Sequence, residues 1–186
     1  TFADLDNDGD QDVLATGNSR EGATVEIFIN DNGTTPNRRL FAAGGSNPFT
    51  GVTEGGADVA DVDGDGDMDI IITGGDLNGA DAENTIAQLY LSNGSTGSFS
   101  YTLSNTSFVG ATLGTVNFSD FDNDGDQDVF LTGSTSNRTA VANPYLNDGT
   151  GNFTLDETTA FMPVTNRTTT EIFDADGDGD QDIIYF

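Results

Sequence analysis

The sequence predicts an all-β protein built from a repeated unit of four short antiparallel strands. An acidic nine-residue motif starts at Asp4, Asp61, Asp120 and Asp174, with spacings of 57, 59 and 54 residues. A near-constant period of this length is typical of repeat architectures. Each copy runs into a short apolar segment rich in β-branched residues, and no helical periodicity of useful length is present.

The segments between the motifs supply the other strands of each unit. The tails that follow the motif read VLATG, IIITG, VFLTG and IIYF, and the second runs read VEIFIN, AQLYLSN and NPYLND. Turns with Asn-Gly or Asp-Gly follow these runs, and such dipeptides favour tight hairpins because they accept positive φ. The third runs are RLFAA, FSYTLS and FTLDE, and a fourth run leads into the next motif.

The most apolar strand indicates how the units pack. Residues 70–73 are apolar on both faces, whereas a half-solvated sheet would alternate apolar and polar residues. Small sheets stacked face against face, as in propeller blades, bury such strands. We therefore expect a β-propeller-like repeat of about three blades and a partial one, in one repeat domain. The expected units cover residues 1–57, 58–116, 117–170 and 171–186.

Composition excludes several classes of function. The chain has 186 residues, enough for one domain with a core, and 32 acidic against 5 basic residues give a net charge of -27. Nucleic acid and anionic membranes are therefore poor partners. The absence of His and Cys removes the commonest general base, the usual zinc ligands and any disulfide. No apolar run approaches the length of a transmembrane helix.

The acidic motif is typical of a calcium-binding loop. Positions 1, 3, 5, 7 and 9 are Asp in all four copies, and position 6 is Gly at Gly9, Gly66, Gly125 and Gly179. In EF-hand-type loops, positions 1, 3 and 5 give side-chain oxygens, position 7 gives a carbonyl, and Gly permits the sharp turn. Here the Asp at position 9 can close the shell, and the carboxylate at position 7 is expected to point to solvent. Mg²⁺ is the second choice, because it prefers a stricter octahedron.

We expect about four Ca²⁺ sites, in which calcium braces each blade. The candidate residues are Asp4, Asp6, Asp8, Asp10 and Asp12; Asp61, Asp63, Asp65, Asp67 and Asp69; Asp120, Asp122, Asp124, Asp126 and Asp128; and Asp174, Asp176, Asp178, Asp180 and Asp182.

The stretches DLDNDGDQDVLATG and YLNDGTGNFTL resemble FG-GAP and VCBS-type repeats and the calcium loops of integrin α-subunit propellers. This resemblance implies a β-propeller with calcium in the loop between the first two strands of a blade, in a secreted or cell-surface protein. It also implies that the carboxylates at positions 1, 3, 5 and 9 and the carbonyl at position 7 are the ligands. The Phe-Gly pair of the family is only loosely matched, at residues 49–51 and 108–110, and residues 161–163 depart from it.

The expected function is non-enzymatic, because no catalytic triad, phosphate loop or zinc signature is present and calcium accounts for the paired carboxylates. A binding, adhesion or surface-assembly module is the first interpretation, with a glycan or protein ligand. The alternatives are a structural subunit of an extracellular fibre and an accessory propeller of a larger secreted enzyme. Glycosylation candidates are Asn32, Asn93, Asn105, Asn137, Asn152 and Asn166. Asn117 also lies in a sequon, but in a strand that leads into an acidic loop.

The last unit holds only two expected strands, which would leave a sheet edge and apolar side chains such as Ile183 and Ile184 exposed. We expect either further repeats of the same chain or identical copies to complete it. Head-to-tail pairing would give a ring if it closes and a filament if it does not.

Overall fold

The computed structural model describes the chain except for residues 21, 31–37, 41–46, 77–83, 95–98 and 165–166. Its described residues form strands and connecting segments, without a helix, and therefore contain no helix that could span a membrane. Sheet 1 contains β1 (Phe2–Ala3), β2 (Asp12–Ser19), β3 (Gly22–Ile29) and β4 (Arg38–Leu40). Sheet 2 contains β5 (Thr53–Ala60), β6 (Asp69–Asp76), β7 (Asn84–Ser92) and β8 (Tyr101–Leu103). Sheet 3 contains β9 (Val116–Ser119), β10 (Asp128–Ser134), β11 (Ala140–Asn147) and β12 (Phe153–Leu155), and sheet 4 contains β13 (Thr170–Phe173) and β14 (Asp182–Tyr185).

Each of the first three sheets is an antiparallel meander in chain order, which confirms the prediction of four-stranded antiparallel blades. The strand before an acidic motif pairs with the strand after it, as β5 does with β6, so the motif joins the first two strands of one sheet. The expected unit limits at residues 57/58, 116/117 and 170/171 fall inside β5, β9 and β13.

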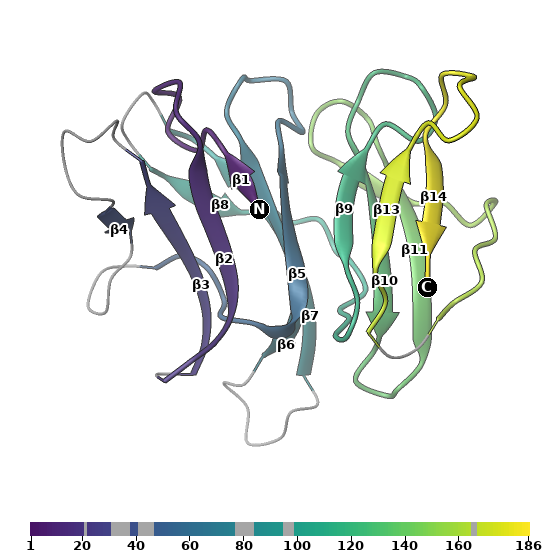
Figure 1. The fold of residues 1–186 in the computed structure, drawn as a ribbon, viewed down its shortest axis with the longest axis horizontal. Helices are drawn as coiled ribbons and strands as arrows, with labels where there is room; N and C mark the ends of the chain where they lie inside the picture. Colours follow the sequence, from purple (N-terminus) through teal and green to yellow (C-terminus); the bar gives the residue numbers. More distant parts are fainter. Residues whose placement is uncertain (21, 31–37, 41–46, 77–83, 95–98, 165–166) are drawn as a thin grey trace.

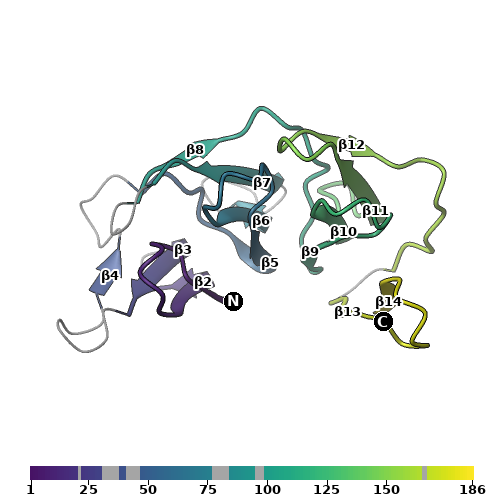
Figure 2. The ribbon, with the colours of Figure 1, turned by 90° about the horizontal axis from the view of Figure 1, so that it is seen from above.

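The four sheets stand side by side in an open arc (Figure 2). The first strands β5, β9 and β13 lie on the inner side of the arc, and β8 and β12 lie on the outer side. Neighbouring inner strands contact one another directly, since the Phe118 backbone N–H on β9 donates to Asp58 Oδ2 on β5 at 2.9 Å. The arrangement is thus propeller-like, without closure into a barrel.

The hydrophobic core lies between adjacent sheets and divides into two clusters. Ile70 and Ile72 of β6 pack toward sheet 1 with Leu14 and Ile27, whereas Ile71 packs toward sheet 3 with Val129. All three isoleucines have 0% exposure. The prediction that this strand is buried on both faces is confirmed, because a central sheet of a stack has a neighbour on each side.

The linkers between sheets act as wedges. Phe108, after sheet 2, packs edge-on against Tyr145 of sheet 3 with ring centroids 5.0 Å apart, and the next residue, Val109, donates its N–H to Tyr145 Oη at 2.9 Å. Phe49 and Thr50 repeat both contacts with Tyr90 of sheet 2, at 4.9 and 3.0 Å. The loosely matched Phe-Gly segments therefore hold sheet 1 to sheet 2 and sheet 2 to sheet 3.

The glycine of each wedge lies against the preceding sheet. A Cβ atom on Gly110 would lie 2.1 Å from the Thr85 carbonyl oxygen of β7, and one on Gly51 would lie 2.2 Å from the Ala23 carbonyl oxygen of β3. Both neighbours are backbone atoms, so neither can move aside without a shift of a strand.

We predict that Gly110→Ala destabilises the protein by about 1–3 kcal/mol, because the added methyl group forces sheet 2 and the linker apart. Gly56→Ala is the matched control, since its Cβ would meet only ordinary contacts at 3.6 Å or more. Chemical denaturation of both variants measures the difference. Equal unfolding midpoints for the two variants would contradict the requirement for glycine at position 110.

Candidate metal sites

The four acidic loops lie along the same end of the molecule (Figure 1). We name them loop 1 (residues 4–12), loop 2 (residues 61–69), loop 3 (residues 120–128) and loop 4 (residues 174–182). Each connects the first two strands of its sheet, where the resemblance placed the calcium loop. The order of the sheets along the arc thus arranges the loops as a row.

The first Asp of each loop organises the turn. Asp61 accepts hydrogen bonds from the Gly64 and Gly66 backbone N–H groups at 2.8 and 3.0 Å. Asp4 accepts the corresponding bond from Gly9 at position 6, and its other bond comes from the Asp8 N–H at position 5. The glycine at position 6 has φ between 91° and 101° in the four loops, a left-handed conformation that favours Gly. The invariant Gly of the motif is therefore required by the turn.

The last Asp of loops 1–3 ties each loop to its sheet. Asp69 accepts the Val62 N–H at its Oδ2 atom (3.0 Å) and the Ser92 N–H of β7 at its Oδ1 atom (2.7 Å). Asp12 and Asp128 accept the equivalent pair of bonds in sheets 1 and 3. All three carboxylates have 0% exposure. The motif indicates position 9 as an ion ligand and gives no sign of this structural role.

Carboxylate oxygens converge in every loop. In each of the following sets, one oxygen per residue lies within 4.8 Å of the others: Asp4, Asp6 and Asp8; Asp61, Asp63 and Asp69; Asp120, Asp122 and Asp128; Asp174, Asp176 and Asp182. The other candidate ligands, at position 9 of loop 1 and at position 5 of loops 2–4, lie in the same loops but outside these sets. The donors are all oxygen, the type that Ca²⁺ and Mg²⁺ prefer.

Loop 1 contains a buried carboxylate oxygen that nothing in the described chain satisfies. Asp6 is 5% exposed, and its Oδ1 atom has no hydrogen-bond partner. Burial, together with the nearby Asp8 and Asp12 carboxylates, raises the pKa of Asp6 to about 6. Burial also raises the pKa of Asp69 to about 7, against the lowering effect of its two backbone hydrogen bonds. Buried acidic groups of this kind are compensated by a bound cation or by a proton, so the residues present fit a hard divalent cation.

Three of the four aspartates at position 7 differ from the expectation that their carboxylates point to solvent, whereas Asp180 is exposed. Asp10, Asp67 and Asp126 are half-buried. Asp67 accepts a hydrogen bond from the Asn7 side chain of loop 1, and Asp180 accepts one from Asn123 of loop 3. Asn7 and Asn123, both at position 4, have left-handed φ values of 58° and 60°. Loop 1 is thus in direct contact with loop 2, and loop 3 with loop 4, which the sequence of a single motif copy did not indicate.

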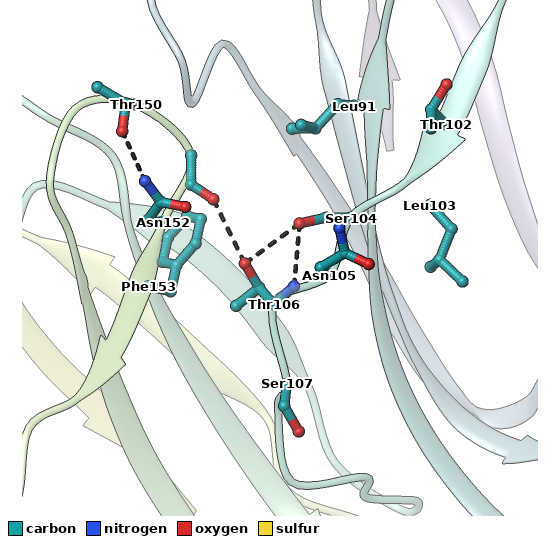
Figure 3. Close-up of a pocket in the computed structure, with 11 residues that line it drawn as sticks. Leu91, Thr102, Leu103, Ser104, Asn105, Thr106, Ser107, Thr150, Asn152 and Phe153 are labelled. Atoms are coloured by element: carbon teal, nitrogen blue, oxygen red, sulfur yellow. Dashed lines mark hydrogen bonds between the residues drawn. The ribbon is translucent and has the colours of Figure 1, made fainter.

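A separate groove of about 490 Å³ lies between sheets 2 and 3 (Figure 3). Its lining is neutral, with hydroxyl, amide and apolar groups from residues 91, 102–107 and 150–153. Many of its polar groups bond to one another, as Thr106 does with Ser104 and with the Gly151 carbonyl. The groove therefore has no ionisable group that would indicate catalysis or metal binding.

The glycosylation candidates that the structure describes, Asn93, Asn105, Asn137 and Asn152, are exposed. Asn32 and Asn166 lie outside the described residues. Asn117, the sequon residue expected in a strand, is half-buried in β9, and its Oδ1 atom is buried. Exposure permits modification of the four described residues, which stays a prediction.

These features define a repeat module of propeller type, with an acidic loop at the same place in every blade. The model of the FG-GAP-like repeat matches residues 4–72 and 120–185, which are more than half of the chain. The chain therefore belongs to the FG-GAP-like repeat family, as the sequence indicated. A search of curated proteins finds no significant match.

We predict that a rise in pH lowers the stability of the metal-free protein and raises the affinity of the candidate sites for calcium. Asp69 keeps a proton in the folded chain up to about pH 7, whereas the unfolded chain loses it near 3.8. Stability without metal should therefore fall as pH rises from about 4 to 7. A Ca²⁺ ion held by Asp69 would have to displace that proton, so calcium affinity should rise over the same change in pH.

Thermal melts in chelator and calcium titrations at pH 5.5, 6.5 and 7.5 measure the two trends. Asp69→Asn should flatten the pH dependence of the melts in chelator. Metal-free stability that increases steadily from pH 5.5 to 7.5 would contradict this prediction.

Proposed function

We propose that this chain is a calcium-binding repeat module in which one Ca²⁺ braces the acidic loop of each blade. The observation that carries the proposal is the convergence of carboxylate oxygens in four equivalent loops, together with the unpartnered buried Oδ1 atom of Asp6. Repulsion among these groups opposes folding unless a cation compensates it.

The chain's own residues would act as follows. The carboxylates at positions 1, 3, 5 and 9 and the carbonyl at position 7 would hold the ion. Ca²⁺ would supply positive charge without redox chemistry and accept six to eight oxygen ligands in a flexible geometry. The Asp at position 9 would transmit this stabilisation to the sheet, because its carboxylate also accepts the N–H groups of Val62 and Ser92 in sheet 2.

We further propose a non-enzymatic role in extracellular binding, adhesion or surface assembly. Membership of the FG-GAP-like family and a neutral groove between sheets support a scaffold that presents surfaces for partners. The alternatives are a structural subunit of an extracellular fibre and an accessory propeller of a larger secreted enzyme. Particle size in calcium separates the fibre from the other two roles, since a fibre subunit would form long assemblies.

The proposed macromolecular partners include further repeats, either of the same chain or of identical copies. Among the described strands, β14 pairs only with β13, whereas the equivalent strands β2, β6 and β10 each pair with two neighbours. Ile184 and Phe186 beside this edge are 47% and 74% exposed. An added strand would satisfy the edge and cover part of this apolar surface.

We predict that excess chelator lowers the melting temperature markedly and expands the chain, because 20 of the 32 acidic residues lie in the four loops. Melting curves and small-angle scattering with Ca²⁺, with Mg²⁺ and with chelator provide the test. Identical melting curves in calcium and in chelator would sink the proposal.

We predict that Asp65→Asn weakens calcium binding in loop 2 and reduces hydrogen-exchange protection of β5 and β6 more than that of sheet 4. The substitution removes one ligand of loop 2 and leaves its other carboxylates less compensated. Asp178→Asn, at the same position of loop 4, is the matched control and should reduce hydrogen-exchange protection of β13 and β14 instead. Equal loss of protection in all sheets for both variants would mean that the blades unfold as one unit.

A further inference from the structure

We propose that Asn147 is a positioning residue that couples the metal sites of loops 2 and 3, so that filling either site strengthens the other. This inference rests on the proposed calcium binding. It concerns a residue that belongs to neither acidic loop.

The side-chain amide of Asn147 joins the two loops directly. Asn147 ends β11 and is 6% exposed. Its Nδ2 atom donates to the Val62 carbonyl in loop 2 at 2.8 Å and to the Gln127 carbonyl in loop 3 at 3.1 Å. A primary amide has two N–H donors, so both are used on the loops. The Asn147 backbone N–H also donates to Asp128 Oδ1 at 2.8 Å.

Both acceptors belong to the frame of a candidate site. Val62 is position 2 of loop 2, and its N–H donates to Asp69 of the convergent set. Gln127 lies between Asp126, whose carbonyl is a candidate ligand, and Asp128. A change in either loop therefore alters the bonds that Asn147 makes to the other loop.

The hairpin turn after Asn147 fills the space between the same two loops. A Cβ on Gly149 would lie 2.5 Å from Asp126 Oδ2 in loop 3, and a Cβ on Gly151 would lie 3.5 Å from the Asp63 Cβ in loop 2. Asp148 holds the turn through hydrogen bonds from the Thr150 N–H and hydroxyl at 3.0 and 2.6 Å. The Gly151 carbonyl accepts the Thr106 hydroxyl on the other side (Figure 3). The Asn147 side-chain amide thus lies at the base of a hairpin turn that is closely packed between loops 2 and 3.

The register of the sheets shows that another blade uses a different residue here. Tyr90 and Tyr145 pair with equivalent residues of β6 and β10, so Ser92 is the counterpart of Asn147. Ser92 keeps the backbone bond to its Asp at position 9, but its side chain has no amide. Asn147→Ser therefore restores a residue that the same fold already accepts at the equivalent place.

The coupling between the two sites arises because the Asn147 hydrogen bonds form only when the loop carbonyl groups are held in place. Without an ion, the carboxylates of a loop repel one another, and the loop is free to spread. An ion fixes the loop, including the carbonyl that Asn147 contacts, so the second loop meets a partner that is already ordered. The second ion then loses less free energy to ordering, which is positive cooperativity between the two sites.

The test measures calcium affinity loop by loop in the full chain by NMR, with the backbone amide signals of Gly66 for loop 2 and Gly125 for loop 3. Asp124→Asn disables loop 3. In the otherwise unchanged chain this substitution should weaken calcium binding at loop 2 by about five-fold or more. In the Asn147→Ser chain the same substitution should change the calcium affinity of loop 2 by less than about two-fold, because the Asn147 side-chain hydrogen bonds between the loops are absent. Asn152→Ser is the matched control, since Asn152 bonds within the hairpin only, and it should keep the full dependence.

Linkage supplies a second measurement should Asp124→Asn prevent folding. Asp65→Asn should weaken binding at loop 3 by the same factor, because coupling is reciprocal. Independent affinities in the unchanged chain, or an equal dependence with and without Asn147, would overturn the inference while leaving calcium binding intact. If neither glycine signal responds to calcium, the proposed function itself fails and the inference fails with it.

Discussion

The compensation of crowded negative charge is the constraint on which this structure depends. Each loop brings carboxylate oxygens within 4.8 Å of one another, in a chain of net charge -27. Backbone N–H groups provide part of the compensation, because Asp61 and Asp69 together accept four of them in loop 2. These bonds also fix the path of the chain between the first two strands. The charge that remains uncompensated is the physical basis for the proposed ion.

The buried Asp at position 9 connects each of loops 1–3 rigidly to its sheet. Asp12, Asp69 and Asp128 have no exposed surface, yet each accepts one N–H from its own loop and one from a residue at or just after the end of the third strand of its sheet. Such a group is costly to bury without partners and stabilising with them. Metal binding at the rim would therefore affect the strands that form the core.

The sequence was sufficient for the features whose signals are local. The acidic motif, its glycine and the apolar tail repeat within a few residues, so the loops, the strands and the buried β6 could be predicted. Sequence periodicity does not show which strands pair. Only the family resemblance therefore implied the sheet to which the run before each motif belongs. The specific polar contacts between blades could not be predicted from the sequence. Asn147 and Val62 are 85 residues apart, and Asn147 looks like an ordinary turn residue after a strand.

The contacts between Asn7 and Asp67 and between Asn123 and Asp180 alternate along the rim. Position 4 is Asn in loops 1 and 3 and Gly in loops 2 and 4, and glycine has no side chain with which to continue the series. Along the row of acidic loops, the contacts between loops therefore repeat every two blades, whereas the fold repeats every blade. Insertion or deletion of a single repeat would place two loops of the same kind side by side and break the alternation. A change by a pair of repeats would preserve it, so the pair is the natural module for lengthening or shortening this array.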